Sequence, residues 1–145
     1  MNPSLSAQEA YEALASYTLL HADPSFIHQH IVDAFAAQHA DEKTRPITLT
    51  FALVGLYLCV EQGYSGKQVQ RTHRQLAQVK RKWPPLPLPA RRGVVLVFDV
   101  LDADPGAARD QMIKRWCASV WQAYEHVRAQ IVELVQAEQR RAARR

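Results

Sequence analysis

Apolar and polar residues follow each other along most of this chain with the spacing of α-helices. Apolar side chains recur every three or four positions, so that each segment has one apolar and one polar face. Helix starts are marked by Ser6 and Glu9, which have the spacing of a capping box, and twice by an Asp-Pro pair, at Asp23 and at Asp104. These signals predict main helices over residues 6–20, 23–39, 46–62, 67–82 and 105–137.

A proline-rich segment separates the fourth of these helices from the fifth. Residues 83–90 contain four prolines, which lack the backbone N–H of a helix and favour an extended chain. We expect this segment to cross the helices as a strap, with Trp83, Leu86 and Leu88 packed against them. Residues 93–103 start with β-branched side chains and predict a short extended piece followed by a single helical turn. The prediction is an all-α, single-domain bundle of about five helices, with a proline-rich extended strap between helices four and five.

The composition agrees with one helical domain. Of the 145 residues 48% are hydrophobic, which is enough for a buried core, and only five are glycine. We expect the domain to span residues 1–139 and a basic C-terminal tail to follow at 140–145, where four arginines gather. No apolar run reaches the roughly 20 residues that cross a bilayer, and the start of the chain lacks the pattern of a signal peptide. The expectation is a cytoplasmic protein with no membrane partner.

The net charge of +4 is unevenly distributed along the chain. Residues 62–98 contain no acidic side chain, and eight basic side chains fall within residues 67–92. The simplest interpretation is a solvated helix face. The alternative is a nucleic-acid-associated protein that contacts phosphates through residues 67–92. Trp83 is the one aromatic residue among these bases, which argues against stacking on single-stranded nucleic acid.

The two cysteines, Cys59 and Cys117, lie in apolar helical segments and are far apart in the sequence. Their spacing excludes a zinc site built from closely spaced cysteines. A disulfide is not expected in a reducing compartment. The interpretation is therefore two buried free thiols.

A histidine-rich segment, residues 21–39, holds four of the six histidines. Imidazole binds metals, transfers protons and titrates near neutral pH, so chemistry is most readily expected here. Helix geometry separates the four side chains. His28 and His39 face nearly the same side but lie ~16 Å apart along the helix axis, and His28 and His30 point to opposite sides. No chelating pair is expected within the segment itself.

A site would therefore need residues from more than one helix. His21 and His28 can meet a residue of another helix such as His73, and these three are the candidate ligands of a divalent metal. Asp33 lies three residues after His30 on the same face, which gives a His-carboxylate pair. His28, Asp33 and His73 are the candidate catalytic residues. The alternative is that these histidines lie on helix surfaces or are hydrogen-bonded within the core.

Two further classes of function follow from these residues. The first is a helical binding or regulatory protein without catalysis. The second is a metal-dependent or His-based enzyme with its site between the second and fourth helices. The last predicted helix also carries Trp116, Trp121 and Tyr124, and spare apolar surface there would support a homodimer.

Short motifs spread over residues 11–125 form a pattern of their own. They are His28-x-x-x-Val32-Asp33-Ala34-Phe35-x-x-Gln38-His39, Leu53-Val-Gly-Leu56, Glu61-x-Gly63, Val69-Gln-x-x-His73-x-x-Leu76-Ala77, Trp83-Pro84, Asp99-Val-Leu101 and Trp116-x-x-Ser119-Val120-Trp121. This pattern resembles an uncharacterised family of small bacterial helical proteins with a domain-of-unknown-function label. The resemblance implies a single helical domain and directs attention to His28, Asp33 and His73, but it implies no activity. Many members begin with a Cys-Pro-Gly-Cys element suited to metal binding, which this chain lacks.

Overall fold

Helices and their connections make up the part of the chain that the structure describes. The structure is a computed structural model, and it describes residues 5–21 and 23–144. These residues form α1 (Ala7–Leu20), α2 (His28–Gln38), α3 (Pro46–Gln62), α4 (Gly66–Ala77), α5 (Val97–Asp102), α6 (Ala107–Ala123), the 3₁₀ turn η1 (Glu125–Val127) and α7 (Arg128–Ala143). The predicted all-α class is confirmed. The number of α-helices within the described residues is seven rather than about five.

The third helix occupies the centre of the bundle. It is apolar nearly all round and is buried along most of its length, as expected of a helix with neighbours on every side. Pro46 lies in its first turn and Gly63 ends it with a φ of 67°, which confirms the predicted bounds. α2 and α6 pack against α3 and against each other, while α4 and α7 cover the rest of it. No helix in the described part of the chain combines the length and the apolar character needed to cross a membrane.

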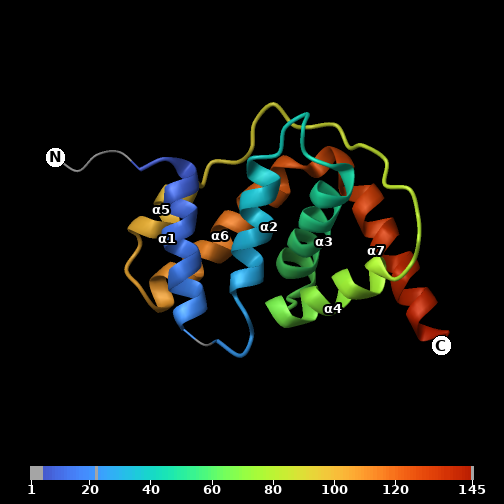
Figure 1. Ribbon diagram of the computed structural model, residues 1–145, viewed down its shortest axis with the longest axis horizontal. Helices are drawn as coiled ribbons and strands as arrows, with labels where there is room; N and C mark the ends of the chain where they lie inside the picture. The colour runs from blue at the N-terminus through green and yellow to red at the C-terminus, as the bar shows by residue number, and fades with distance from the viewer. Residues whose placement is uncertain (1–4, 22, 145) are drawn as a thin grey trace.

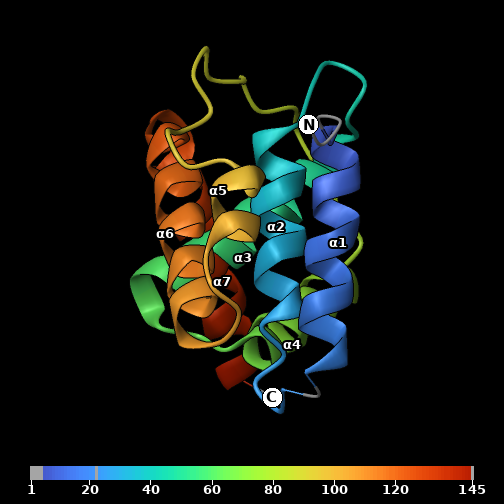
Figure 2. The same ribbon diagram turned by 90° about the vertical axis from the view of Figure 1, so that its left-hand side faces the viewer.

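The arrangement of the helices is visible in two views. Figure 1 shows α2 and α3 side by side in the middle, with α1 and α5 at one end and α4 and α7 at the other. Figure 2, turned by 90°, shows α1 and α2 on one side of the molecule and α6 on the opposite side. The junction of α2, α3 and α6 therefore lies inside the bundle.

The second helix begins later than the sequence predicts. The carboxylate of Asp23 accepts hydrogen bonds from the backbone N–H groups of Ser25 and Ile27, both at 2.9 Å, and so closes a turn. Phe26 follows with a φ of 61°, a left-handed conformation that a helix does not contain. Asp23 therefore caps a turn, and α2 starts only at His28.

The predicted helix over 105–137 is divided into α6 and α7. At the break, the Tyr124 hydroxyl donates to a backbone carbonyl near the end of α2 at 2.6 Å. Glu61 accepts from the Trp121 indole N–H at 2.6 Å and pairs with Arg128 at 2.6 Å. These contacts fix the end of α6 and the start of α7 against the central helices, and the chain turns between them. Sequence periodicity does not reveal the break, because the apolar spacing continues through it.

The predicted basic tail is helical as far as Ala143, so the expected boundary after residue 139 falls inside α7. Arg141 pairs with Glu138 at 2.7 Å, and Arg140 pairs with Glu133 at 3.2 Å. These glutamates compensate the basic charge locally, and the helix continues through the arginines.

The fourth helix ends at Ala77 rather than near residue 82, and residues 80–96 contain neither helix nor strand. We call residues 80–96 the strap. It lies between α4 and the short α5, not before one long final helix, and Figure 1 shows it passing α7 and the ends of α3 and α2. Trp83 packs edge-on against Phe51 at a centroid distance of 5.3 Å, and Leu86 and Leu88 are partly buried against the core.

The far end of the strap is fastened to the C-terminus of α2. Arg92 Nη1 donates to the carbonyls of Ala40 at 2.6 Å and Gln38 at 3.3 Å. A guanidinium suits this position because the last carbonyls of a helix lack partners within the helix. Gln38 Nε2 donates in return to the Val95 carbonyl at 2.8 Å, and Gln38 Oε1 accepts from the Trp116 indole at 2.9 Å.

Candidate functional site

The two cysteines lie together between α3 and α6. Cys59 is near the end of α3, Cys117 is in the middle of α6, and each of the two thiols shifts the pKa of the other. Cys117 is completely buried, and its Sγ donates to the backbone carbonyl of His30 at 3.6 Å. Cys59 is only partly buried. The fold therefore brings together one accessible thiol and one enclosed thiol.

The surroundings of the two thiols make them chemically unequal. The neighbouring Cys117 side chain, followed by the His30 side chain, lowers the pKa of the Cys59 thiol in spite of its partial burial, and the charge of Lys114 acts in the same direction. The neighbouring Cys59 side chain and complete burial raise the pKa of the Cys117 thiol well above its ordinary value. Cys59 is thus the thiolate of the pair and Cys117 the protonated partner.

His30 lies on the side of α2 that faces the cysteines. It is 6% exposed, and it lowers the pKa of Cys59. Its Nδ1 atom is buried and has no hydrogen-bond partner among the described residues. The expected pair of His30 with Asp33 does not form a hydrogen bond; Asp33 Oδ1 accepts instead from Gln29 Nε2 at 3.0 Å.

Asp33 is a buried carboxyl group one turn further along α2. It is 3% exposed, and its Oδ2 atom, like His30 Nδ1, has no partner in the described part of the chain. Burial raises the pKa of Asp33 well above its ordinary value, and the nearby charge of Cys59 adds to this, against the opposing hydrogen bond from Gln29. The carboxyl occupies the space that a Cβ would fill at Gly55 of α3. The protonated form of Asp33 is therefore favoured, and the absence of a side chain at Gly55 leaves room for it.

A small cavity opens onto the accessible thiol. It has a volume of about 230 Å³ and is lined by His30, Cys59, Val60, Gly63, Tyr64, Lys114 and Ala118. Cys117 and Asp33 are not part of its wall. A small reactant that enters this cavity can therefore reach Cys59.

The predicted metal ligands bond to three different neighbours. His21 is exposed at the end of α1, where its Nδ1 contacts the Tyr17 carbonyl at 2.8 Å. His28 Nδ1 lies 2.9 Å from the Thr18 hydroxyl, and burial lowers the pKa of His28. His73 Nε2 lies 2.8 Å from a backbone carbonyl of α3, and burial lowers its pKa as well.

The histidines are thus held as structural hydrogen-bonding groups at separate places. In the described residues, no three or more His, Cys, Asp or Glu side chains are placed to hold a metal ion. Of the three candidate catalytic residues, Asp33 lies beside reactive groups, while His28 faces α1 and His73 faces α3.

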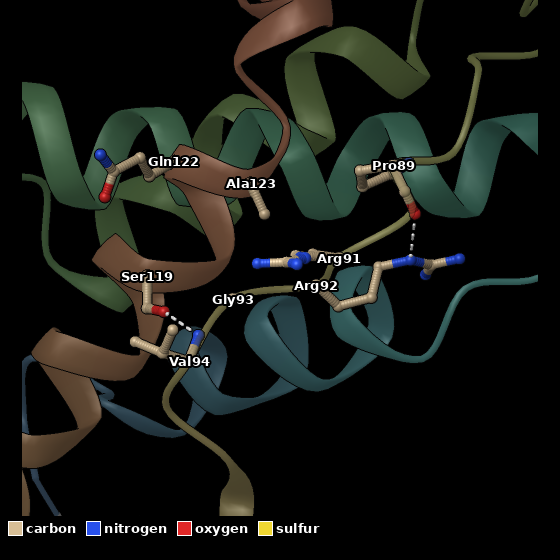
Figure 3. A pocket seen from close by; sticks show the side chains of 8 residues that line it. All are labelled: Pro89, Arg91, Arg92, Gly93, Val94, Ser119, Gln122 and Ala123. Atoms are coloured by element: carbon tan, nitrogen blue, oxygen red, sulfur yellow. Dashed lines mark hydrogen bonds between the residues drawn. The ribbon is translucent and has the colours of Figure 1, made fainter.

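A larger hollow of about 590 Å³ lies where the strap crosses α6 (Figure 3). Two of its polar side chains, Ser119 and Arg92, are engaged in holding the strap. Ser119 Oγ accepts from the backbone N–H of Val94 at 2.8 Å, and Arg92 turns toward the Pro89 carbonyl at 2.9 Å. Arg91 is exposed, and no cysteine, histidine or carboxylate lines this hollow. The smaller cavity at Cys59 is therefore the better candidate, because a cysteine, a histidine and a lysine line it.

Sequence reasoning missed Cys59, Cys117 and His30 as a group. The cysteines are 58 positions apart, and no pattern in one dimension places them in contact. The one local signal is Gly55, a glycine inside an otherwise apolar helix, which often marks a close approach of another chain segment. Its neighbour is Asp33, which the sequence did single out.

Comparison with known proteins gives a family but no activity. No curated protein and no solved structure matches this chain. A model of a family of unknown function, DUF5946, matches residues 2–125. This span agrees closely with the region whose motifs resemble an uncharacterised family. The chain therefore belongs to the DUF5946 family, whose function is unknown.

Proposed function

We propose that this protein is a thiol-based redox protein in which Cys59 reacts with a small hydroperoxide and Cys117 then forms a disulfide with it. The observation that carries the proposal is the proximity of the two thiols on the packed helices α3 and α6, with Cys59 but not Cys117 lining a cavity. A nucleophilic thiolate beside a second, enclosed thiol is the arrangement that such chemistry requires.

The reaction proceeds in two balanced steps. The Cys59 thiolate attacks one oxygen of the hydroperoxide, the O–O bond breaks, and the alkoxide leaves and takes a proton from solvent to become an alcohol. Cys59 is thereby oxidised to a sulfenic acid. The Cys117 sulfur then attacks the Cys59 sulfur, the S–O bond breaks, and the hydroxyl leaves as water with the proton of Cys117. Two external thiols return the disulfide to the reduced pair.

The size and lining of the cavity support a small oxidant. A volume of about 230 Å³ is below the range of typical drug-sized ligand pockets, so a bulky substrate does not fit without rearrangement. His30 and Lys114 both line the cavity and lower the pKa of the Cys59 thiol, which favours the thiolate. A reducing cytoplasm would keep the pair in its reactive form, so we also propose a cytoplasmic location in a bacterial cell.

The remaining functional hypotheses have less support. Trp116, Trp121 and Tyr124, on which the homodimer was argued, are at most 5% exposed and belong to the core of one chain. Arg81 and Arg92 of the basic stretch are partly buried and contact Glu138 and backbone carbonyls, respectively. Association with nucleic acid through the exposed bases of residues 67–92 would require binding that weakens steeply with salt. A non-catalytic binding role would not explain why the two thiols differ in pKa and in accessibility.

Treatment of the reduced protein with hydrogen peroxide tests the proposal. We expect an intramolecular Cys59–Cys117 disulfide, seen by mass spectrometry as a loss of two hydrogens and as a cross-linked peptide after digestion. The Cys117→Ala variant should instead accumulate a sulfenic acid at Cys59 that dimedone traps.

The matched variant is Cys59→Ala, which keeps the enclosed thiol and removes the accessible one. It should leave Cys117 unmodified at the same peroxide concentration, with an unchanged circular dichroism spectrum as evidence of folding. Two free thiols in the peroxide-treated wild type would contradict the proposal. Equal oxidation of Cys117 in the Cys59→Ala variant would contradict the assigned order of the two thiols.

A further inference from the structure

A third hollow lies between α7 and the part of the strap that follows α4. It has a volume of about 320 Å³ and shares no lining residue with the cavity at Cys59. Residues of the strap form one wall, residues of α7 form the other, and Thr50 of α3 completes the lining. This volume lies within the range of pockets that hold small molecules, which is about 300–1,000 Å³.

The walls of this hollow are mainly apolar. Trp83, Leu86 and Leu134 line it, and all three are only partly buried against the core. The Trp83 ring is held by its edge-on contact with Phe51 of α3. Apolar side chains that line a hollow without filling it favour a ligand with an apolar body.

One cation in this hollow, Arg81, has hydrogen-bonding groups to spare. Its guanidinium carbon lies 5.3 Å from the centroid of the Trp83 ring, and its side chain is 25% exposed. Its Nε atom is buried and has no hydrogen-bond partner among the described residues. Glu138 lies 3.9 Å from Arg81 Nη2, which is too far for a hydrogen bond, and it accepts instead from Arg141 Nε at 2.7 and 3.1 Å. Arg81 is therefore an incompletely paired cation beside an apolar wall.

The other charges around the hollow leave it positive. Lys82 lines it and is exposed, so it adds a second cation. Glu133 also lines it, but this carboxylate pairs with Arg140 at 3.2 Å and its side chain is 69% exposed. Since Glu138 is paired with Arg141, the charge of Arg81 is the one that a ligand can neutralise close to the apolar wall.

We propose that this hollow binds a small monocarboxylic acid with an aromatic or aliphatic body. The carboxylate accepts hydrogen bonds from the Arg81 guanidinium, which presents donors in the planar arrangement that carboxylates match. The body of the acid lies against Trp83 and Leu134. A phosphate without an apolar part would leave these walls exposed to water. This proposal does not depend on the redox function, because the two cavities have separate linings.

The first test uses 3-phenylpropionate and its uncharged amide, 3-phenylpropionamide, as probes of the unmodified chain. Binding is followed by ¹H–¹⁵N NMR through the indole N–H signal of Trp83, which is identified as the signal missing in a Trp83→Phe variant. We expect the acid to shift this signal to saturation, with a dissociation constant below about 1 mM. The amide should bind at least about tenfold more weakly, because it makes no charge-assisted hydrogen bond. Equal binding of the acid and the amide would overturn the proposal.

The second test removes the cation. Arg81→Met keeps a long unbranched side chain and should weaken binding of the acid at least about tenfold, with little change for the amide. Arg91→Met is the matched control, since Arg91 is an exposed arginine of the same strap that lines the hollow at α6 instead. It should bind the acid like the wild type. Unchanged affinity in a folded Arg81→Met protein, or equal losses in the two variants, would overturn the role of Arg81.

A third measurement places the acid without changing Arg81, and so remains informative if Arg81→Met does not fold. Nuclear Overhauser effects should join the phenyl protons of the bound acid to the methyl groups of Leu134. Contacts only with residues outside the hollow would overturn the proposal. The Cys59→Ala variant should bind the acid with unchanged affinity, whether or not the wild type forms a disulfide, and this separates the outcome from that of the redox experiment.

Discussion

The two ends of α2 meet the same neighbour, α6, in opposite ways. At the C-terminal end, polar groups are matched: Gln38 donates to the strap and accepts from Trp116, and Arg92 caps the last carbonyls. Toward the N-terminal end, His30 and Asp33 each keep a buried polar atom without a partner among the described residues, beside two thiols.

The two ends of α2 therefore differ in role: one stabilises the fold, and the other carries titratable groups. A buried polar group that is fully hydrogen-bonded contributes to stability and to a unique packing, whereas an unmatched one costs about 1–3 kcal/mol. The C-terminal end therefore fastens the strap and α6 to the core. The N-terminal end gives up stability and gains titratable groups near an accessible sulfur, which is the usual balance at functional sites.

We expect the largest loss of stability from removing the hydrogen bonds at the C-terminal end of α2. Gln38→Leu keeps a side chain of similar size but leaves the Trp116 indole N–H and the Val95 carbonyl without partners. We expect a loss of about 2–4 kcal/mol in the free energy of unfolding, measured by urea denaturation.

The control on the other end of the same helix is Gln29→Leu, which removes one hydrogen bond to Asp33 at a partly exposed position. It should cost about 1 kcal/mol or less. Equal losses for the two variants would remove the contrast between the two ends of α2.

A smaller loss is expected from filling the space beside Asp33. Gly55→Ala would place a methyl group where the Asp33 carboxyl lies, and overpacking of this kind costs about 1–3 kcal/mol. The same substitution in a chain that already carries Asp33→Ala should cost less, because the carboxyl is gone. The double-mutant cycle is measured by urea denaturation, and a coupling energy near zero would show that Gly55 does not make room for Asp33.

The pH dependence of stability sharpens the contrast further. Because the folded-state pKa of Asp33 is raised, its protonated form stabilises the fold fully below the unfolded pKa of about 3.9, and this contribution is lost as pH rises toward the folded value. Asp33→Asn does not ionise. Its melting temperature relative to the wild type should therefore rise between about pH 4 and neutral pH, by on the order of a few degrees. A difference that stays constant over this range would show that Asp33 does not change its protonation there.

Local signals in the sequence were sufficient to predict the bounds of the helices that begin or end with such signals. The capping box at Ser6 and the proline and glycine around α3 give bounds that the structure shares within a residue. The start of α2 and the break after α6 were not predictable in this way. They depend on the left-handed Phe26 and on contacts of Glu61 and Tyr124 with distant helices, and local spacing carries no information about either.

The candidate site, too, was only partly predictable from the sequence. Asp33 was identified from the sequence, as a carboxylate on a histidine-bearing helix face. The partner assigned to it was His30, but the structure places Cys59 and Cys117 near the carboxyl instead. Contacts between helices that are distant in sequence decide this arrangement, and the density of histidines in residues 21–39 was a weaker guide than it first suggested.

The most direct test of the unequal thiol pair is the rate of alkylation of each cysteine in the reduced, folded protein as a function of pH. Iodoacetamide reacts with thiolates, and peptide mapping distinguishes Cys59 from Cys117. We expect Cys59 to be alkylated with a midpoint clearly below the value of about 8.5 for an ordinary thiol, while Cys117 stays unmodified until the protein is unfolded. A midpoint for Cys59 near that of an ordinary thiol, or equal reactivity of the two cysteines, would contradict the assignment of Cys59 as the reactive thiolate.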